Sequence, residues 1–306
     1  MGWKADSGRQ PSPPAVPAPH SPTVHERVAA ARQVLRAAGI GADEAELSAR
    51  VLAEHVLGWD AARFFTRAHE PEPSTFEMHY QALVARRAAR EPLAYITGCQ
   101  EFWGLPFEVT PAVLIPRPET ELIVDAVLER FSRRCHDRLA VADACTGSGC
   151  VVVALARELP RAAFVATDIS QSALTVARRN AARHGAADRI RFVHANLLDG
   201  ITGPFDLIVA NPPYVRQGDR AALQPEVRDY EPEVALFGGE SGVDVVAALV
   251  HEAPQRLRRG GYFIFEFGFG QDLAVEELIG ETSELTMVGL RRDLQGIART
   301  MIAQRS

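Results

Sequence analysis

The spacing of apolar residues changes partway along this 306-residue chain. Between about Thr23 and Arg90, apolar residues recur every three or four positions in three stretches, which is the period of an amphipathic helix. Glycines punctuate these stretches, so a small helical domain is expected there. From Leu139 onward, short apolar runs alternate with helix-period segments. This alternation is typical of an α/β fold, in which a mostly parallel sheet carries helices on both faces.

The apolar runs of the second region place its strands and helices. Five runs predict strands, two weaker runs follow near the C-terminus, and four segments have the helical period. The strands are expected at Leu139–Ala144, Ala163–Asp168, Ile190–Ala195, Phe205–Ala210 and Gly261–Phe267, with weaker ones near Leu285–Leu290 and Ile297–Ala303. The helices are expected at Leu122–Phe131, Cys150–Arg157, Gln171–His184 and Val243–Leu257.

Composition shifts divide the chain into four parts. Residues 1–22 hold six prolines and no apolar core, so this tail is expected to be disordered, and it has the features of neither a secretory signal nor an organelle presequence. Residues 23–92 form the helical domain. Residues 93–116 are β-prone and broken by glycine and proline, which predicts a short β-hairpin linker. Residues 117–306 form the α/β domain.

Bulk composition excludes some classes of protein. The net charge of −6 argues against a protein that coats nucleic acid, because phosphate binding requires a surplus of Lys and Arg. No apolar run approaches the ~20 residues that span a bilayer. The four cysteines and nine histidines lack the spacing of a metal site, so no metal is predicted. Reduced thiols in the cytoplasm are the expected state.

The tetrapeptide Asn211-Pro212-Pro213-Tyr214 carries the strongest chemical signal in the chain. It follows a predicted buried strand, at the end where open α/β sheets place their ligands. The two prolines remove backbone donors and leave carbonyl oxygens. The side-chain oxygen of Asn211 and the carbonyl of Pro212 would accept both hydrogens of a planar –NH2 group, and Tyr214 would stack on that group. This pattern suits an amide or an exocyclic amine, although Asn-Pro is also ordinary at a turn.

A second signal is the glycine-rich loop Asp143-Ala144-Cys145-Thr146-Gly147-Ser148-Gly149, which joins the first strand of the α/β domain to its helix. Its two glycines allow a tight turn and a close approach of the backbone to a ligand. The loop is neither a Walker loop nor a full G-x-G-x-x-G sequence, because Val152 stands where the last glycine would be. By itself it indicates several kinds of nucleotide-binding fold.

Polar residues at three other strand ends complete the candidate site. Asp168 ends the second strand, where a carboxylate accepts hydrogen bonds from both ribose hydroxyls of an adenosine ligand. Asn196 and Leu197 follow the third strand, where Asn196 would hydrogen-bond the amino group of an adenine and Leu197 would cover its ring. Glu266 ends an apolar strand and is either a satisfied buried carboxylate or a group that faces the ligand.

Together these features resemble a class I S-adenosylmethionine-dependent methyltransferase that acts on an amide or amino nitrogen. Three further stretches narrow the resemblance to the release-factor glutamine N5-methyltransferases, the HemK/PrmC family. They are Glu91-Pro92-Leu93-Ala94-Tyr95-Ile96-Thr97-Gly98, Glu101-Phe102-Trp103-Gly104-Leu105 and Ile115-Pro116-Arg117-Pro118-Glu119-Thr120-Glu121. The resemblance covers roughly residues 24 to 303 and implies a Rossmann-like methyltransferase sheet, joined to the helical domain by the hairpin.

The resemblance implies a reaction and a set of roles. Members of the family methylate the Gln of the Gly-Gly-Gln motif in class I peptide chain release factors, with S-adenosyl-L-methionine as donor and S-adenosyl-L-homocysteine as product. The helical domain would help to dock the release factor, and no nucleic acid or membrane would take part. The tetrapeptide from Asn211 to Tyr214 would hold the substrate amide, and Phe102 and Arg117 would line another wall of the pocket. The donor would be held by Cys145, Thr146, Gly147, Ser148, Gly149, Asp168, Asn196, Leu197 and Asn211.

One residue departs from the family pattern, which commonly has glycine where this chain has Cys145. Because cysteine has a Cβ, we expect an ordinary backbone conformation there. Cysteine at this point also occurs in a sister family that methylates a glutamine of a large-subunit ribosomal protein, which is therefore the first alternative. A DNA adenine methyltransferase, which would need a basic face and base flipping, and a non-catalytic binding module are the others.

Overall fold

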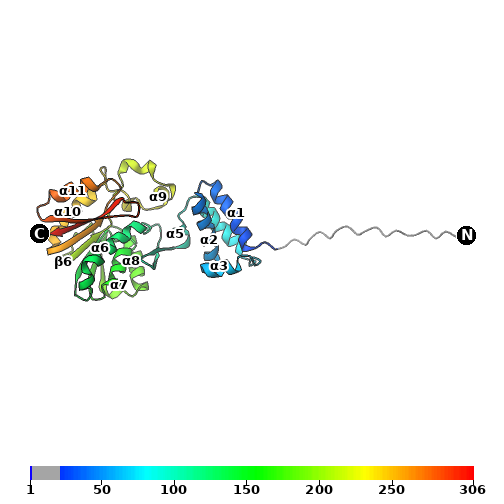
Figure 1. The fold of residues 1–306 in the computed structure, drawn as a ribbon, viewed down its shortest axis with the longest axis horizontal. Coiled ribbons are helices and arrows are strands. Elements are labelled where there is room, and N and C mark those ends of the chain that lie inside the picture. Colours follow the sequence, from blue (N-terminus) through cyan, green and yellow to red (C-terminus); the bar gives the residue numbers. More distant parts are fainter. Residues whose placement is uncertain (2–20) are drawn as a thin grey trace. The chain divides into compact units, whose positions relative to one another are not determined.

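The computed structural model describes residue 1 and residues 21–306, which form two compact units, Met1–Ala88 and Ala89–Ser306 (Figure 1). Nearly all of the tail that was predicted to be disordered lies outside the described residues. Among the residues that are described, no helix combines the length and the apolarity needed to cross a bilayer.

Four helices make up the described part of the first unit, residues 21–88. The sequence pattern does not predict the third of these helices, because its seven residues contribute little periodicity. Thr23 starts the first helix with a reciprocal capping box, in which the Thr23 hydroxyl accepts from the Glu26 backbone and the Glu26 carboxylate accepts from Thr23 N at 2.8 Å. The helices are α1 (Val24–Ala37), α2 (Ala42–Leu57), α3 (Ala61–Arg67) and α4 (Phe76–Ala88).

The second unit is a seven-stranded mixed sheet in the order β5-β4-β3-β6-β7-β9-β8. The five strands from β5 to β7 run parallel, and β9 pairs antiparallel with both β7 and β8. This confirms the α/β class, and the two weaker C-terminal runs are the antiparallel edge. The strands are β3 (Ala140–Ala144), β4 (Ala163–Asp168), β5 (Ile190–His194), β6 (Phe205–Ala210), β7 (Leu257–Glu266), β8 (Leu285–Arg292) and β9 (Ala298–Arg305).

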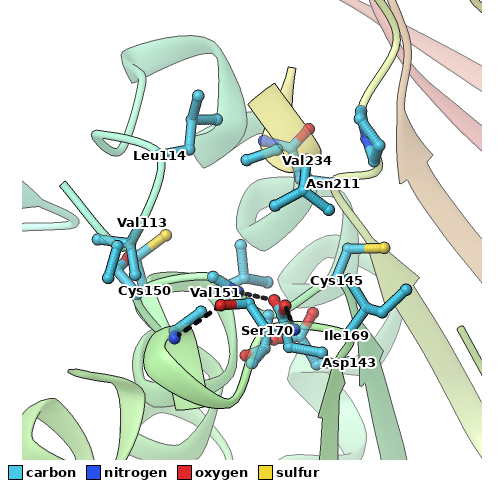
Figure 2. Close-up of a pocket in the computed structure, with 18 of the residues that line it drawn as sticks. Val113, Leu114, Asp143, Cys145, Cys150, Val151, Ile169, Ser170, Asn211 and Val234 are labelled. Carbon is cyan, nitrogen blue, oxygen red and sulfur yellow. Dashed lines mark hydrogen bonds between the residues drawn. The ribbon is translucent and has the colours of Figure 1, made fainter. Parts of the chain in front are cut away.

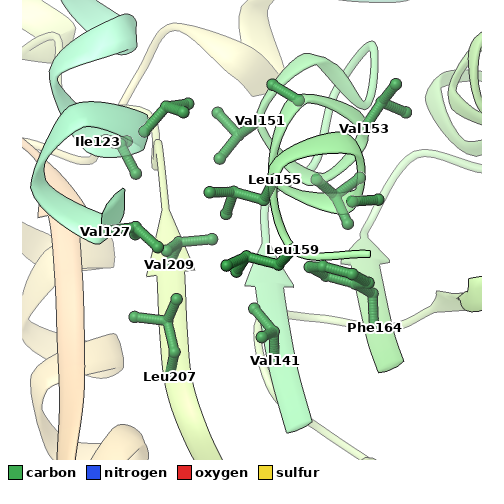
Figure 3. Close-up of a cluster of buried hydrophobic side chains, with 14 of the residues drawn as sticks. Ile123, Val127, Val141, Val151, Val153, Leu155, Leu159, Phe164, Leu207 and Val209 are labelled. Atoms are coloured by element: carbon green, nitrogen blue, oxygen red, sulfur yellow. The ribbon is translucent and has the colours of Figure 1, made fainter. Parts of the chain in front are cut away.

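Helices cover both faces of this sheet, and side chains that alternate along the central strands fill two cores. Val141 and Leu207 point into the core under α6 and α7, which Figure 3 shows, whereas Ala142 and Ile208 point into the core under α10 and α11. The longer helices are α6 (Glu121–Phe131), α7 (Cys150–Glu158), α8 (Gln171–Arg183), α10 (Asp244–Arg256) and α11 (Asp272–Gly280). The short α5 (Leu93–Thr97) and α9 (Pro225–Tyr230) lie in the connections.

A two-stranded hairpin, β1 (Cys99–Phe102) with β2 (Leu105–Glu108), precedes the sheet and belongs to the second unit. The buried side chain of Asn180 on α8 fastens it. Its Nδ2 donates to the carbonyls of Glu108 and Ser148 at 3.0 and 2.9 Å, and its Oδ1 accepts from Glu108 N at 2.8 Å. One fully satisfied amide therefore ties the hairpin to the glycine-rich loop.

The order of the strands determines where a ligand can bind. β4 and β5 follow β3 on one side of the sheet, and β6, the next strand in the chain, pairs with β3 on its other side. The loops after β3 and β6 consequently leave the sheet in opposite directions and open a crevice at its carboxyl edge. The glycine-rich loop follows β3, and Asn211 follows β6, so both sequence signals meet at this crevice.

Candidate active site

The crevice contains a cavity with about 1150 Å³ of empty space, part of it open to solvent. Most of the residues singled out for donor binding line it: Cys145, Thr146, Gly147, Ser148, Asp168, Asn196, Leu197 and Asn211. In Figure 2, Asn211 and Val234 lie across the cavity from Asp143 and Ser170. Gly149 lies behind the lining, where a Cβ would come within 3.1 Å of the Ala177 side chain, so its role is the close packing of α7 against α8.

The glycine-rich loop is held by hydrogen bonds at both ends. Thr146 N donates to the carbonyl of Thr167 at 3.0 Å, and the Thr146 hydroxyl donates to Asp143 Oδ2 at 2.6 Å. Gly149 N donates to the Thr146 carbonyl at 2.8 Å and starts α7. Burial raises the pKa of Asp143 to about 7, so this carboxyl is partly protonated at neutral pH.

The expected backbone conformation of Cys145 is wrong. Its φ is +60°, which is the left-handed region that glycine adopts freely and a residue with a Cβ adopts at a cost of about 1–2 kcal/mol. The loop geometry is thus kept and the side chain is tolerated, because Cys145 packs against the core under α10. Burial also raises the pKa of its thiol, so the group stays protonated and unreactive at neutral pH.

Replacing Cys145 by glycine is expected to stabilise the protein. Relief of the left-handed strain exceeds the entropy that glycine loses on folding, so the free energy of unfolding should rise by about 0.5–1 kcal/mol. Urea denaturation measures this change. Cys145→Ala, which removes the sulfur but keeps the Cβ, is the matched control. An equal gain in the alanine variant would show that strain is not the cause.

Asp168 is fixed in place by the backbone around it. Its Oδ2 accepts from Gly147 N and its Oδ1 from Ser170 N, each at 2.8 Å. Each carboxylate oxygen keeps a further lone pair for a ligand. Burial raises the pKa of Asp168, and the two backbone donors oppose that rise. The carboxylate is a preorganised acceptor at the cavity wall.

A hydrogen bond from β4 also holds the segment that follows β5. The hydroxyl of Thr167 donates to the carbonyl of Leu197 at 2.6 Å, and Leu197 has a positive φ of 48°. The left-handed turn presents the Leu197 side chain, only 8% exposed, at the wall of the cavity. Asn196 lies beside it in the lining. The pair is therefore suited to the edge and the face of a flat ring.

Asn211 has one satisfied end and one free end. Its Nδ2 donates to the Thr120 hydroxyl at 3.0 Å, whereas its Oδ1 is buried and has no hydrogen-bond partner among the described residues. An orphaned buried acceptor is costly in a folded protein, so it marks a place where a ligand donor fits. Thr120 and Pro213 line the same part of the cavity.

Tyr214 and Pro212 do not line the cavity. The Tyr214 hydroxyl donates to Glu266 Oε1 at 3.0 Å, and the Tyr214 carbonyl accepts from Gln271 Nε2 at 2.9 Å. Burial raises the pKa of Glu266 to about 7, although the nearby hydroxyls of Thr120 and Tyr214 lower it. Glu266 is buried and does not line the cavity, so it does not face the ligand, but it is not fully satisfied either, because its Oε2 has no partner among the described residues.

Phe102 and Arg117 do not form the expected pocket wall. Phe102 is 1% exposed and lies in the core with Phe107, because it is the inward-facing residue at the end of its hairpin strand. Arg117 pairs with the buried carboxylate of Glu231, whose other oxygen accepts from Ile115 N at 3.2 Å. Arg117 thus holds the connection that leads to Thr120.

Part of the cavity wall comes instead from residues that the sequence pattern does not single out. Ala112, Val113 and Leu114 line the cavity. Tyr95 positions this segment, since its hydroxyl donates to the Val113 carbonyl at 2.6 Å. A sequence signal existed, because Tyr95 lies in one of the stretches that carry the resemblance. Nothing in that stretch indicated which carbonyl its hydroxyl would reach.

Family models match both units of the chain. Residues 26–98 match the PrmC N-terminal domain, and residues 120–226 match the methyltransferase small domain. A release factor glutamine methyltransferase from Bradyrhizobium diazoefficiens is 42% identical, over 86% of this chain and 89% of its own length. Proteins of the same name from Geobacter sulfurreducens and Koribacter versatilis are 44% and 41% identical, over 79% and 85% of this chain and 84% and 91% of their own lengths.

Solved structures agree on the fold. The hMettl16 catalytic domain, solved in complex with a MAT2A 3′UTR hairpin, superposes with a TM-score of 0.54 at 18% identity, over 72% of this chain and 81% of that one. Identity this low bears on the fold alone. The sheet order, the cavity at its switch point and the curated relatives together show a class I methyltransferase fold, and the chain belongs to the release factor glutamine methyltransferase family.

Proposed function

We propose that the protein transfers a methyl group from S-adenosylmethionine to the side-chain nitrogen of the Gln in the Gly-Gly-Gln motif of class I release factors. The observation that carries this proposal is the free, buried Oδ1 of Asn211 in the cavity at the end of β6. A carboxamide –NH2 is a donor that such an acceptor fits. We place this reaction in the cytoplasm, because translation termination takes place in that compartment.

The donor side of the cavity suits an adenosine with a charged tail. Asp168 offers the ribose a carboxylate that the backbone already holds, and Asn196 and Leu197 suit the adenine. Residues 145–148 of the glycine-rich loop would approach the amino-acid part of the donor. When bound, S-adenosylmethionine supplies an electrophilic methyl group on a cationic sulfur.

The protein residues have to position the acceptor nitrogen. An amide nitrogen is a weak nucleophile because its lone pair is delocalised into the carbonyl. Asn211 Oδ1 would accept one N–H, fix the nitrogen and stabilise the positive charge that develops on it. No side chain among the described residues stands out as a dedicated base for this step, and we propose that the proton leaves to solvent after the transfer.

Donor binding is expected to strengthen as the pH rises through 7. Asp143, whose pKa is raised to about 7 by burial, is partly protonated in the free protein, and a cationic donor favours its ionised form. Binding should then release a proton, and the dissociation constant should be about tenfold higher at pH 6 than at pH 8. Calorimetry in buffers of different ionisation enthalpy measures both effects. Asp143→Asn should abolish them, and an unchanged pH dependence in that variant would assign it to another group.

Separate incubations with three candidate substrates test the proposed function against its alternatives. The protein is incubated with labelled S-adenosylmethionine and, separately, a class I release factor, a ribosomal fraction and duplex DNA. Label on the release factor alone is expected. Label on a large-subunit ribosomal protein instead would support the sister family, and label on DNA would support an adenine methyltransferase. No label anywhere, with the donor bound normally, would favour the non-catalytic module.

We also propose that the helical unit docks the release factor. Its match to the PrmC N-terminal domain supports this role, because the described residues of that unit supply no strand to the methyltransferase sheet. Deleting residues 1–88 should therefore raise the KM for the release factor while leaving donor binding to the remaining unit intact. Equal methylation of the release factor by the truncated chain would contradict it.

A further inference from the structure

Thr120 stands at the start of α6 but does not cap that helix. It is 2% exposed and ends a 3-10 turn (Pro118–Thr120) that runs directly into α6, with a helical φ of −66° and ψ of −21°. A capping residue has a non-helical backbone, so the Thr120 side chain makes no capping hydrogen bond. The hydroxyl of Thr120 is therefore used elsewhere, and its neighbours are Asn211 and Glu266.

Glu266 supplies the acceptor that this hydroxyl needs. It is 1% exposed at the end of β7, and its Oε1 accepts from the Tyr214 hydroxyl at 3.0 Å. Its Oε2 is buried and has no donor at full hydrogen-bond geometry in the described part of the chain. The Thr120 hydroxyl lies near enough to this carboxyl to lower its pKa. A buried carboxylate takes donors strongly, so the Thr120 hydrogen is expected to turn toward Glu266 and its unpartnered Oε2.

The number of hydrogens that Thr120 can donate then determines the orientation of the Asn211 side-chain amide. A hydroxyl has one hydrogen to donate and lone pairs with which to accept. With its hydrogen given to Glu266, Thr120 Oγ1 can only accept, so it must face the Asn211 –NH2 group, as it does at 3.0 Å. The other end of the same amide, Oδ1, is left for the cavity.

We propose that Thr120 and Glu266 are positioning residues that lock the side-chain amide of Asn211 with its oxygen toward the substrate. The proposal rests on the function proposed above and adds two residues to it. Without the lock, a free Thr120 hydroxyl would donate to Oδ1, and the reversed amide would present –NH2 to the –NH2 of the substrate. Two donors facing each other cannot bind, so the reversed form is inactive.

Substitution of Thr120 by valine tests the lock with little change of shape. Thr120→Val removes the acceptor for Asn211 Nδ2, and the rate of methyl transfer at saturating substrates should fall between about 10- and 100-fold. The dissociation constant of S-adenosylmethionine should stay within about threefold, because Asn211 still lines the cavity. Thr120→Ser keeps the hydroxyl and should keep at least about a third of the rate. The assay is run at pH 8.5, above the pKa of Glu266 of about 7.

A matched control lies on the neighbouring strand. Thr300 faces Glu266 in the β7–β9 register, and its buried hydroxyl has no partner among the described residues. Thr300→Val makes the same chemical change beside the same carboxyl but outside the lock, and it should leave the rate unchanged. A loss in Thr300→Val as large as in Thr120→Val would show that any buried polarity change near Glu266 disturbs the site, and would overturn the proposal.

The coupling between the two residues gives a second test. Glu266→Met removes the carboxylate and frees the Thr120 hydrogen, so it should lower the same rate constant. If both residues act through Asn211, the double variant Thr120→Val with Glu266→Met should fall no further than the slower single variant, within about threefold. Losses that multiply would show independent effects and contradict the lock.

A readout without catalysis separates failure of the lock from failure of the proposed function. The side-chain –NH2 resonance of Asn211, assigned by its loss in Asn211→Asp, should show slowed hydrogen exchange in the wild-type protein and in Thr120→Ser, and fast exchange in Thr120→Val. Fast exchange in the wild-type protein would overturn the lock. Slow exchange with no methylation of a release factor would keep the lock and reject the substrate.

Discussion

Asn211→Ala is expected to lower the rate of methyl transfer to a release factor by about 10³-fold, which is the loss that follows removal of one preorganised polar group from a reacting centre. Asn211 Oδ1 is the one buried amide oxygen without a partner among the cavity residues that the structure describes, and its removal takes that acceptor away. Single-turnover kinetics measures the rate directly.

Donor binding separates this loss from misfolding. The dissociation constant of S-adenosylmethionine for Asn211→Ala should stay within about threefold of the wild-type value, because the ribose and adenine sites lie on β4 and β5, away from the β6 loop. A variant that binds the donor and unfolds at the wild-type temperature, yet methylates at the wild-type rate, would remove Asn211 from the reaction.

Asp168→Ala should weaken donor binding by about 100-fold, since two hydrogen bonds to a charged group are lost at once. The substitution also removes the acceptors for Gly147 N and Ser170 N, so part of the effect comes from a looser loop. An analogue of S-adenosyl-L-homocysteine that lacks the ribose 2′-hydroxyl separates the two contributions. If Asp168 binds that hydroxyl, the analogue should bind the wild-type protein more weakly than S-adenosyl-L-homocysteine does. The two compounds should bind Asp168→Ala with nearly equal affinity.

Asp188→Ala is the matched control for this prediction. Asp188 is exposed in a short turn before β5 and does not line the cavity. Its removal changes the net charge by the same amount and should leave the dissociation constant unchanged. Equal losses in the two variants would show that the effect is one of overall charge, and would contradict a direct role for Asp168.

The parts of the site that the sequence predicted share a simple physical cause. Asp168 and Asn211 each end a run of apolar residues, and the carboxyl ends of parallel strands meet at one edge of a sheet. Local patterns therefore brought the ribose site and the acceptor loop to the same crevice. The glycines of the loop after β3 contributed in the same way, because a tight turn needs them wherever the chain goes next.

The parts that were not predicted depend on contacts between distant segments. Thr120 and Asn211 are 91 positions apart in sequence, and Tyr214 and Glu266 are 52 apart, so no local pattern links their hydroxyl, amide and carboxyl groups. The conformation of Cys145 was misjudged because the fold imposes a left-handed turn at that point whatever the side chain.

The family resemblance places Phe102 at the pocket, but the pleat of its strand points its side chain into the core. The family resemblance also places Arg117 at the pocket, but Arg117 pairs with Glu231, which lies 114 positions away in the sequence. Membership of a motif indicates that a residue matters in the family. Only the fold determines whether it acts in the cavity or in the support of the cavity.

The most direct test of the central claim is peptide mass spectrometry of a purified class I release factor after incubation with this protein and S-adenosylmethionine. The account predicts a gain of one methyl group on the side-chain nitrogen of the Gln in Gly-Gly-Gln, and no gain in a release factor in which that Gln is replaced by Ala. A release factor that stays unmodified, or one that is methylated at another residue and equally in the Ala variant, would contradict it.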